Sequence, residues 1–154
     1  MTTNSGGVGG LRDGQRRTKR PNGGVGRGMA KQTTLSAAHI DYLASQLLGR
    51  VATTGGDGKP HVVPTSFRYN PALGTIDVGG FHVATTKKYR DVQANPWAAI
   101  VVDDLVSTDP WRPRMLEIRG AAEAIAAGGE ALGPGFGAAF IRIHPGKVNS
   151  FGIE

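Results

Sequence analysis

The chain has 154 residues, enough for one domain with a single sizeable core, and it contains no cysteine. Disulfides, thiolate metal sites and a cysteine nucleophile are therefore excluded. Lysine and arginine total 18 against 12 acidic residues, and the net charge of +6 is unevenly distributed. Residues 1–33 hold seven of the basic residues and one acid, which leaves 11 of each sign in the remainder. This neutral remainder argues against nucleic acid as a partner of the folded domain.

Residues 1–33 are rich in glycine and almost free of large apolar side chains. Such a composition cannot bury a core, so we predict a disordered basic tail before a domain over residues 34–154. Basic tails of this kind can hold RNA through nonspecific phosphate contacts; an upstream extension before Met29 is the simpler interpretation. No apolar segment follows Arg16-Arg17, which excludes a twin-arginine export signal. We therefore expect a cytoplasmic protein without a membrane partner.

A short helix is the first predicted element of the domain. Ser36 has a side chain typical of a helix N-cap. The apolar residues that follow it recur at helical spacing and form one face: Ile40, Leu43, Leu47 and Leu48. Gly49 is expected to end this helix.

From residue 50 onward the pattern changes to short strands separated by turns that contain glycine and proline. The stretches with strand character are 50–54, 60–69, 75–78, 97–102, 116–123, 140–143 and 147–153. Pro64 lacks an N–H donor, so we expect it at a bulge or an unpaired position. Residues 103–113 and 128–137 are expected to be loops. The pattern predicts a mainly β fold of roughly six antiparallel strands closed into a small barrel.

A second short helix is predicted between two strands, at residues 85–96. Thr85 or Thr86 caps it, and Asn95-Pro96 stops it. The glycine pair just before this helix, Gly79-Gly80, ends a strand and lets the backbone approach another body closely.

Two lysines, Lys87 and Lys88, fall in the first turn of this inserted helix. Unpaired backbone N–H groups and the positive end of the helix dipole already point outward there, so the lysines are electrostatically misplaced. A bound anion, most commonly a phosphate, would resolve the conflict. A solvated basic pair on a surface helix is the equally weighted alternative.

Few residues suggest direct catalysis. The four histidines have no metal-ligand spacing, and no nucleophile elbow or catalytic triad can be identified, so we predict no metal and no catalytic side chain. Asp103-Asp104 is either an acid–base pair or, more simply, two solvated carboxylates. The run 111–114 places Trp111 beside two arginines, which suits a pocket for planar or anionic groups or an ordinary loop anchor. Phe151 either covers a ring or belongs to the core.

Taken together, these motifs resemble the pyridoxamine 5'-phosphate oxidase-like split barrels, also called FMN-binding split barrels. The resemblance is closest to the branch that uses the deazaflavin coenzyme F420. The matching stretches are 42–53, 58–64, 67–70, 73–80, 87–96, 101–105, 109–114, 117–120 and 141–145. Each stretch is weak alone, whereas their order and spacing over residues 36–154 are fairly specific.

The resemblance implies a homodimer with the cofactor in a groove between the subunits. Lys87 and Lys88, with Thr86 beside them, would hold the cofactor phosphate. Residues on two strands would line the ring and the ribityl chain: Val63, Pro64, Thr65, Val78, Gly79 and Gly80. Phe151 stands near the place where members often put an aromatic side chain over the ring from the partner, and Trp111 is assigned to the same site. His61 stands where the family pattern has a glutamine.

The resemblance further implies an oxidoreductase that transfers a hydride from reduced F420 to a small, unsaturated, electron-poor substrate. Such a cofactor carries the difficult chemistry, so the absence of a triad or metal motif in the sequence is expected. The alternatives are an FMN-dependent enzyme of the same family and a flavin or deazaflavin carrier without turnover. FMN ends at its phosphate, while F420 continues into lactate and glutamates, for which Lys87, Lys88 and Arg90 would form a basic exit.

Overall fold

The computed structural model describes residues 33–154, so the tail predicted to be disordered over residues 1–33 lies almost wholly outside the described part of the chain. The helices are α1 (Ala37–Ala44) and α2 (Lys87–Ala94), with short 3-10 helices η1 (Val83–Thr85) and η2 (Gly129–Leu132). The strands are β1 (Leu48–Thr54), β2 (Pro60–Asn70), β3 (Thr75–Gly79), β4 (Trp97–Thr108), β5 (Trp111–Ile125), β6 (Phe140–Ile143) and β7 (Lys147–Phe151). None of the described helices is long and apolar enough to span a membrane, and the cytoplasmic location stays a prediction.

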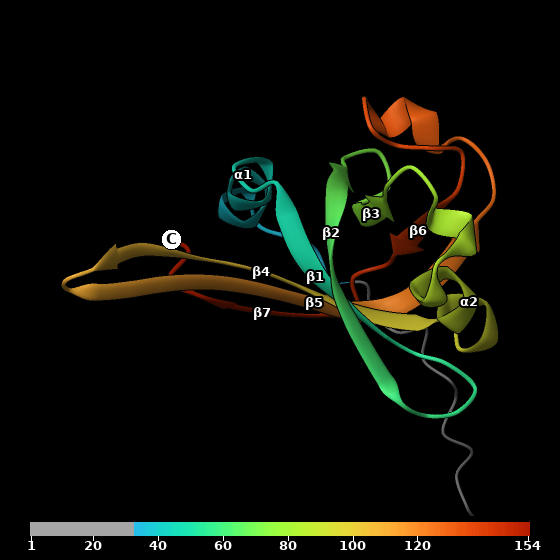
Figure 1. The fold of residues 1–154 in the computed structure, drawn as a ribbon. Coiled ribbons are helices and arrows are strands. Elements are labelled where there is room, and N and C mark those ends of the chain that lie inside the picture. The colour runs from blue at the N-terminus through green and yellow to red at the C-terminus, as the bar shows by residue number, and fades with distance from the viewer. Residues whose placement is uncertain (1–32) are drawn as a thin grey trace, which may run out of the picture.

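Six strands close into a ring in the order β4-β1-β2-β3-β6-β5, because β5 also pairs with β4. The long strand β5 pairs with two strands along one edge. Its residues 122–125 pair with β6, and its residues 115–119 pair with β7. All of these pairings are antiparallel. The predicted mainly β split barrel is confirmed (Figure 1), and each of the seven predicted strand stretches, 147–153 included, has a counterpart among the seven strands, one more than the rough count of six.

Helix α1 begins where the sequence predicted and ends earlier. The Ser36 hydroxyl accepts a hydrogen bond from the backbone N–H of His39 at 3.2 Å, and the His39 ring accepts one from the Ser36 N–H at 3.3 Å. The helix ends at Ala44, where the Ser45 hydroxyl donates to the carbonyl of Tyr42 at 2.6 Å. The prediction that Gly49 ends the helix was wrong, because the residues from Leu48 onward already pair with β2.

Pro64 does not lie at a bulge: it is opposite Arg50 of β1, and at this position its strand is paired on that side only. The register between β1 and β2 is continuous from Leu48↔Ser66 to Thr54↔Pro60. On the other side of β2, pairing with β3 begins only at Ser66, opposite Gly79. The edge of β2 over residues 60–65 is therefore not covered by β3, which is where a residue without an N–H donor is tolerated.

The segment 103–113, predicted as a loop, is instead a two-stranded arm. Pairing of β4 with β5 continues to Thr108↔Trp111, with one register shift between Leu105 and Ser107. Figure 1 shows this hairpin projecting from the barrel, with β7 beside it and α2 on the opposite side. Its polar residues pair across the strands, since the Arg114 guanidinium donates to both oxygens of Asp104 at 2.9 and 2.5 Å. A cross-strand ion pair of this kind supports a strand in a sequence that reads as a loop.

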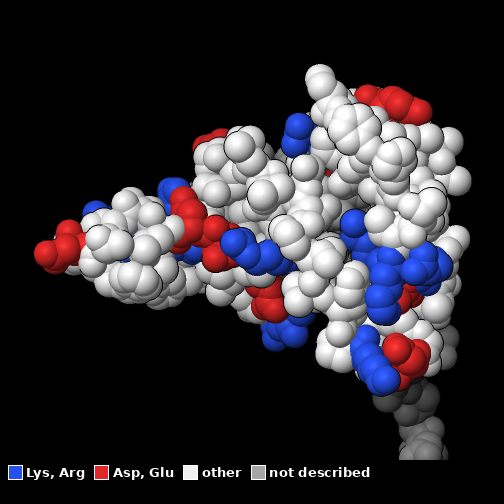
Figure 2. All heavy atoms as spheres, in the orientation of Figure 1, with Lys and Arg blue, Asp and Glu red and all other residues white. Residues whose placement is uncertain are grey.

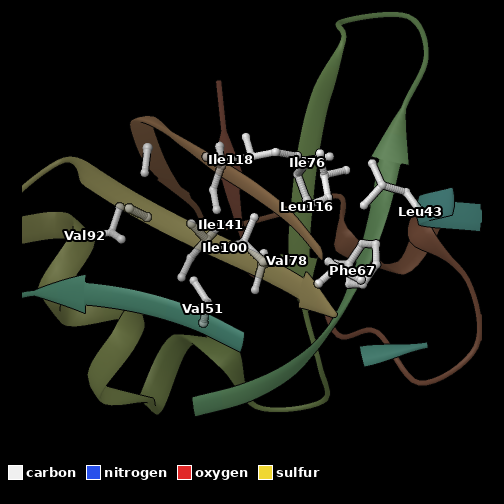
Figure 3. Packing of buried hydrophobic residues seen from close by; sticks show 14 of the residues in the cluster. Leu43, Val51, Phe67, Ile76, Val78, Val92, Ile100, Leu116, Ile118 and Ile141 are labelled. Carbon is white, nitrogen blue, oxygen red and sulfur yellow. The ribbon is translucent and has the colours of Figure 1, made fainter. Parts of the chain in front are cut away.

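Branched apolar side chains fill the interior of the barrel (Figure 3). The fully buried ones come from five strands and include Val51, Ile76, Val78, Ile100, Leu116, Ile118, Ile141 and Ile143. Helix α1 adds Leu43 and α2 adds Val92, so both helices pack on this core. Each such side chain contributes about 1.5–3 kcal/mol when it is removed from water.

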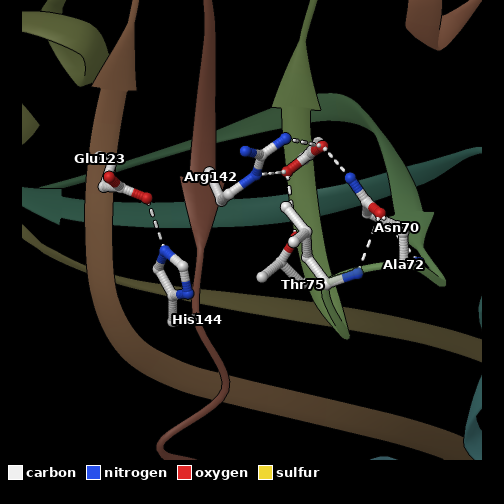
Figure 4. A network of polar contacts seen from close by, with 8 residues as sticks. Asn70, Ala72, Thr75, Glu123, Arg142 and His144 are labelled. Atoms are coloured by element: carbon white, nitrogen blue, oxygen red, sulfur yellow. Dashed lines mark hydrogen bonds and ion pairs between the residues drawn. The ribbon is translucent and has the colours of Figure 1, made fainter.

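One charged group lies inside the wall of the barrel. The Asp77 side chain is fully buried, and the Arg142 guanidinium donates to both of its oxygens at 2.8 and 2.9 Å. Asn70 and Thr75 donate further hydrogen bonds to it at 3.3 and 3.4 Å (Figure 4). Hydrogen bonds to Asp77 raise the pKa of Arg142 above its ordinary value, even though burial alone would lower it. This network joins β2, β3 and β6 and is fully satisfied.

Candidate functional site

Helix α2 starts with a first turn that lacks a side-chain cap. Its bounds, from Lys87 with Thr86 as N-cap to Ala94 before Asn95, confirm the predicted helix. The Thr86 hydroxyl donates to the carbonyl of Val83 at 2.7 Å and makes no capping hydrogen bond. Figure 2 shows lysine and arginine side chains gathered over the α2 side of the barrel. The start of α2 therefore combines uncapped N–H groups with positive side chains.

The two lysines of this turn differ in their surroundings. Lys87 is exposed, and its Nζ donates to Oδ1 of Asp91, one helical turn later, at 2.7 Å. Lys88 is half-buried and has no hydrogen bond or ion pair within the described chain. Burial lowers the pKa of Lys88 below its ordinary value, because no negative group nearby compensates the desolvation. Lys88 is thus the cation of this turn that lacks a counter-charge.

Asp91 anchors a small polar cluster between α2 and β1. Its side chain is 6% exposed and accepts hydrogen bonds from Lys87 and, at 2.8 Å, from the Thr53 hydroxyl. Burial alone would raise the pKa of Asp91, but these two hydrogen bonds and the nearby positive charge bring it below its ordinary value. Gly55 is required beside it, because a Cβ at that position would come to 2.5 Å from Oδ1 of Asp91.

His61 completes this cluster without a hydrogen bond of its own. Its Nδ1 is fully buried, has no hydrogen-bond partner and lies 3.8 Å from Oδ2 of Asp91. The residue opposite it on β1 is Thr53, which already donates to the same carboxylate. A fully buried ring nitrogen without a partner is unusual in a folded protein and calls for an explanation.

The residues predicted to line a cofactor slot lie on adjacent parts of β2 and β3. The Thr65 hydroxyl donates to the carbonyl of Gly79 at 3.3 Å, which joins the two strands where their pairing begins. Val63 is half-buried and Pro64 is exposed at the uncovered edge of β2. The Val78 side chain belongs to the barrel core, so only its backbone can face a ligand.

The close approach expected at Gly79-Gly80 exists, and a side chain of the same chain makes it. The Phe136 ring fills the space where a Cβ of Gly79 would stand, and Arg68 stacks on this ring at 4.9 Å from its centroid. The N–H of Gly137 donates to the carbonyl of Gly80 at 3.0 Å, which holds the loop 133–137 over the end of β3. This loop thus covers one face of the predicted slot.

Trp111 lies on the arm and Phe151 on β7 beside it, so neither is near α2. Both are exposed, by 68% and 59%, and they line a cavity of about 430 Å³ with Arg112 and Arg114. Figure 1 places the arm and α2 on opposite sides of the barrel. Within one chain the structure therefore joins Thr65 to Gly79 and brings β2 to α2 through His61 and Asp91, whereas the two aromatic residues lie apart from α2.

Asp103 and Asp104 are both held by arginines, neither as a solvated pair nor as an acid–base couple. Asp103 pairs with Arg50 at 2.5 Å. Hydrogen bonds from Arg114 hold the pKa of Asp104 below its ordinary value. Burial and the neighbouring Asp104 charge raise the pKa of Tyr42 to about 12.

No group of histidine and acidic residues within residues 33–154 is arranged to hold a metal ion.

Sequence reasoning missed Asp91, Thr53 and the position of His61 in the cluster. The i,i+4 spacing of Lys87 and Asp91 was a readable signal for an ion pair on the helix. Thr53 and His61 come from β1 and β2, and only the strand register brings them to α2.

The family model of pyridoxamine 5'-phosphate oxidase matches residues 35–146. The chain belongs to this family. A 5a,11a-dehydrotetracycline/5a,11a-dehydrooxytetracycline reductase from Streptomyces rimosus is 41% identical over 115 residues, which cover 75% of this chain and 81% of the relative.

Solved structures share the fold of this family member. An F420 reductase superposes with a TM-score of 0.52 at 25% identity, covering 67% of this chain and 89% of that chain. An FAD-binding protein from Mycobacterium smegmatis superposes with a TM-score of 0.55 at 23% identity, covering 77% and 97%. The second similarity concerns the fold alone.

Proposed function

We propose that the protein is an oxidoreductase that transfers a hydride from reduced coenzyme F420 to a small unsaturated organic substrate. The 41% identity to a reductase and the similarity to an F420 reductase support the reaction class. The observation that carries the proposal is Lys88, a half-buried cation without a counter-charge at the uncapped start of α2. A phosphate group bound there would supply the missing negative charge.

The described residues fit a flavin-type cofactor with a phosphate. Lys88 and the first-turn N–H groups of α2 suit the phosphate, with Thr86 beside them. Val63 and Pro64 offer the uncovered edge of β2 to a ring or ribityl chain, next to the Thr65–Gly79 contact. When bound, the reduced deazaflavin supplies the hydride. The chain's own residues bind it, orient it and exclude water from the slot.

A homodimer is part of this proposal. Exposed side chains of the arm and of the adjacent β7 form an apolar surface away from the core of their own chain: Leu105, Val106, Trp111 and Phe151. Such a surface is typical of an interaction site. In a two-fold dimer one subunit would supply Trp111 of its arm and Phe151 of its β7 to the slot of the other, which would unite the two separated halves of the site.

The test is an assay of reduced F420 with a panel of enones and quinones. We expect oxidation of the reduced deazaflavin that requires both the protein and an acceptor. Deazaflavin binding without turnover on any acceptor would instead favour a carrier. Turnover with reduced FMN alone would place the protein among the FMN-dependent members of the family.

Sedimentation of the purified protein at micromolar concentration tests the proposed dimer. A monomer at that concentration would contradict it.

A further inference from the structure

The unpartnered nitrogen of His61 faces a carboxylate that already has other donors. Nδ1 lies 3.8 Å from Oδ2 of Asp91, beyond hydrogen-bond distance and within range of a charge interaction. Nε2 makes no hydrogen bond either, and unlike Nδ1 it is not fully buried. The ring therefore has one nitrogen directed at Asp91 and the other accessible to a ligand.

The protonation state of the His61 ring changes the net charge of the cluster and therefore its attraction for an anion. Asp91 offsets the charge of Lys87, since their side chains are 2.7 Å apart, so the pair carries almost no net charge. A protonated His61 would return the cluster to a net positive charge. The element opposite His61, β1, contributes the uncharged Thr53, and the turn before it carries Asp57 and Lys59, both exposed. His61 is thus the group whose protonation decides the charge of the cluster.

Strand alternation puts His61 on the same face as the proposed slot. Side chains at i, i+2 and i+4 of a strand point to one face, so His61 shares its face with Val63 and Thr65. The burial of β2 agrees, because these three residues are more buried than Val62 and Pro64 between them. His61 is the member of this face that approaches the Lys87–Asp91 pair, and Lys87 belongs to the first turn of α2, where the phosphate is proposed to bind.

We propose that His61 is a further phosphate-binding residue, which takes up a proton when the anion binds. In the bound state Nδ1–H points to Asp91 and Nε2–H donates to a phosphate oxygen, while Lys88 supplies the second positive charge. Asp91 is a positioning residue in this arrangement, because it fixes which ring nitrogen faces the ligand. The inference rests on the proposed function, in which the cofactor phosphate lies at the start of α2.

The direction of the pH effect follows from the charge of the ring. The protonated ring is positive and attracts the anion, whereas the neutral ring does not. Affinity should therefore be highest at low pH and fall as the pH rises. Because a charge-assisted hydrogen bond is involved, we expect a fall of about tenfold between pH 5.5 and 8.5. By linkage, a bound anion must favour protonation of His61 by the same factor.

The experiment measures F420 affinity by fluorescence titration from pH 5.5 to 8.5. F420 is suited to it because its phosphate is a diester whose charge is constant in this range, unlike the monoester of FMN. The matched variants are His61→Gln and His144→Gln. His144 also pairs with a carboxylate, Glu123 of β5, at 2.6 Å, just after the end of β6 (Figure 4). We expect the pH dependence in the wild type and in His144→Gln, and a flat profile at the high-pH affinity in His61→Gln.

A second measurement avoids both the variants and the identity of the cofactor. The NMR titration of the His61 ring in the wild-type protein is recorded with chloride and with sulfate, an anion of constant charge. We expect the midpoint to move to higher pH in sulfate, and that of the His144 ring to stay. An unmoved His61 midpoint, or pH-dependent F420 affinity that survives in His61→Gln, would overturn the inference. If F420 does not bind at any pH while sulfate still shifts His61, the proposed cofactor is wrong and the anion site stands.

Discussion

Asp77 and Asp91 are both buried carboxylates of the same barrel, and they differ in how completely their partners satisfy them. Asp77 receives both nitrogens of one guanidinium, together with Asn70 and Thr75. Asp91 receives Lys87 and Thr53, and a third candidate donor, His61, remains 3.8 Å away. The first network needs nothing more, whereas the second lies beside an unpaired lysine and an orphaned ring nitrogen.

This difference separates a structural charge from a binding site. A buried ion pair whose hydrogen bonds are all made joins strands and leaves no donor or acceptor for a ligand. An incompletely satisfied cluster at the surface end of a helix keeps donors available, at a cost in stability that a bound anion offsets. This criterion favours the start of α2 over Arg142 for the proposed phosphate site, although both places carry cations.

The largest expected effect is on stability, at Asp77. The change Asp77→Ala removes a fully buried carboxylate and leaves the half-buried Arg142 guanidinium without its partner, so it should reduce the free energy of unfolding by about 3–5 kcal/mol. Urea denaturation followed by circular dichroism measures this loss. The neighbouring change Glu123→Ala, at an exposed pair with His144, is the control and should cost less than about 0.5 kcal/mol. Similar losses of unfolding free energy in the two variants would mean that the buried Asp77 network contributes no more to stability than the exposed Glu123–His144 pair.

The next effect is on ligand affinity, at Lys88. The change Lys88→Ala should weaken F420 binding by about ten- to hundredfold, because it removes a charge-assisted contact to phosphate. The free energy of unfolding should stay the same or rise slightly, since a half-buried cation without a partner is removed. Lys147→Ala, at an exposed residue of β7, is the matched control. Equal affinity in the wild type and in the Lys88 variant would exclude Lys88 as the anchor.

A smaller effect concerns acid stability at Asp91. The pKa of Asp91 in the folded protein lies below its ordinary value of about 3.8. Its contribution to stability is therefore fully present above about pH 4 and is lost as the pH falls through the lower, folded pKa. Chemical denaturation at pH 6 and at pH 3 should show a loss that is smaller in Asp91→Asn. An identical acid loss in both proteins would mean that Asp91 is not selectively stabilised as a carboxylate.

The smallest expected effect on folding is on the arm. Because Trp111 is 68% exposed, the change Trp111→Ala should alter the free energy of unfolding of one chain by less than about 0.5 kcal/mol. In the proposed dimer it should nevertheless weaken F420 binding, since the arm of one subunit covers the slot of the other. Fluorescence titration and sedimentation report the two properties separately. Unchanged affinity would show that the arm lies outside the site.

The sequence predicted the barrel and the inserted helix because their signals are local. The cap at Thr86, the stop at Asn95-Pro96 and the alternating strands need no knowledge of the fold. The arm was missed because Asp103, Asp104 and Pro113 resemble loop residues, and only the cross-strand pairing with β5 stabilises them as strands. The end of α1 was misplaced for a similar reason, since Leu48 continues the helical spacing but pairs with β2.

The candidate site was predictable in composition and not in arrangement. Both lysines could be assigned to the first turn of the helix from their position alone. Their different roles follow from Asp91, whose burial and hydrogen bond to Thr53 depend on how α2 packs on β1. The ring that fills the space beside Gly79 comes from Phe136, far along the chain, and no local pattern indicates it.

The most direct test of the proposed function compares F420 and FMN in one fluorescence titration at low and high salt. The two ligands share the tricyclic ring and ribityl chain, and only F420 extends beyond the phosphate towards the basic face at the start of α2. We expect F420 to bind more tightly than FMN, with a preference that shrinks as salt screens the charges. Tight FMN binding without measurable F420 affinity would contradict the assignment.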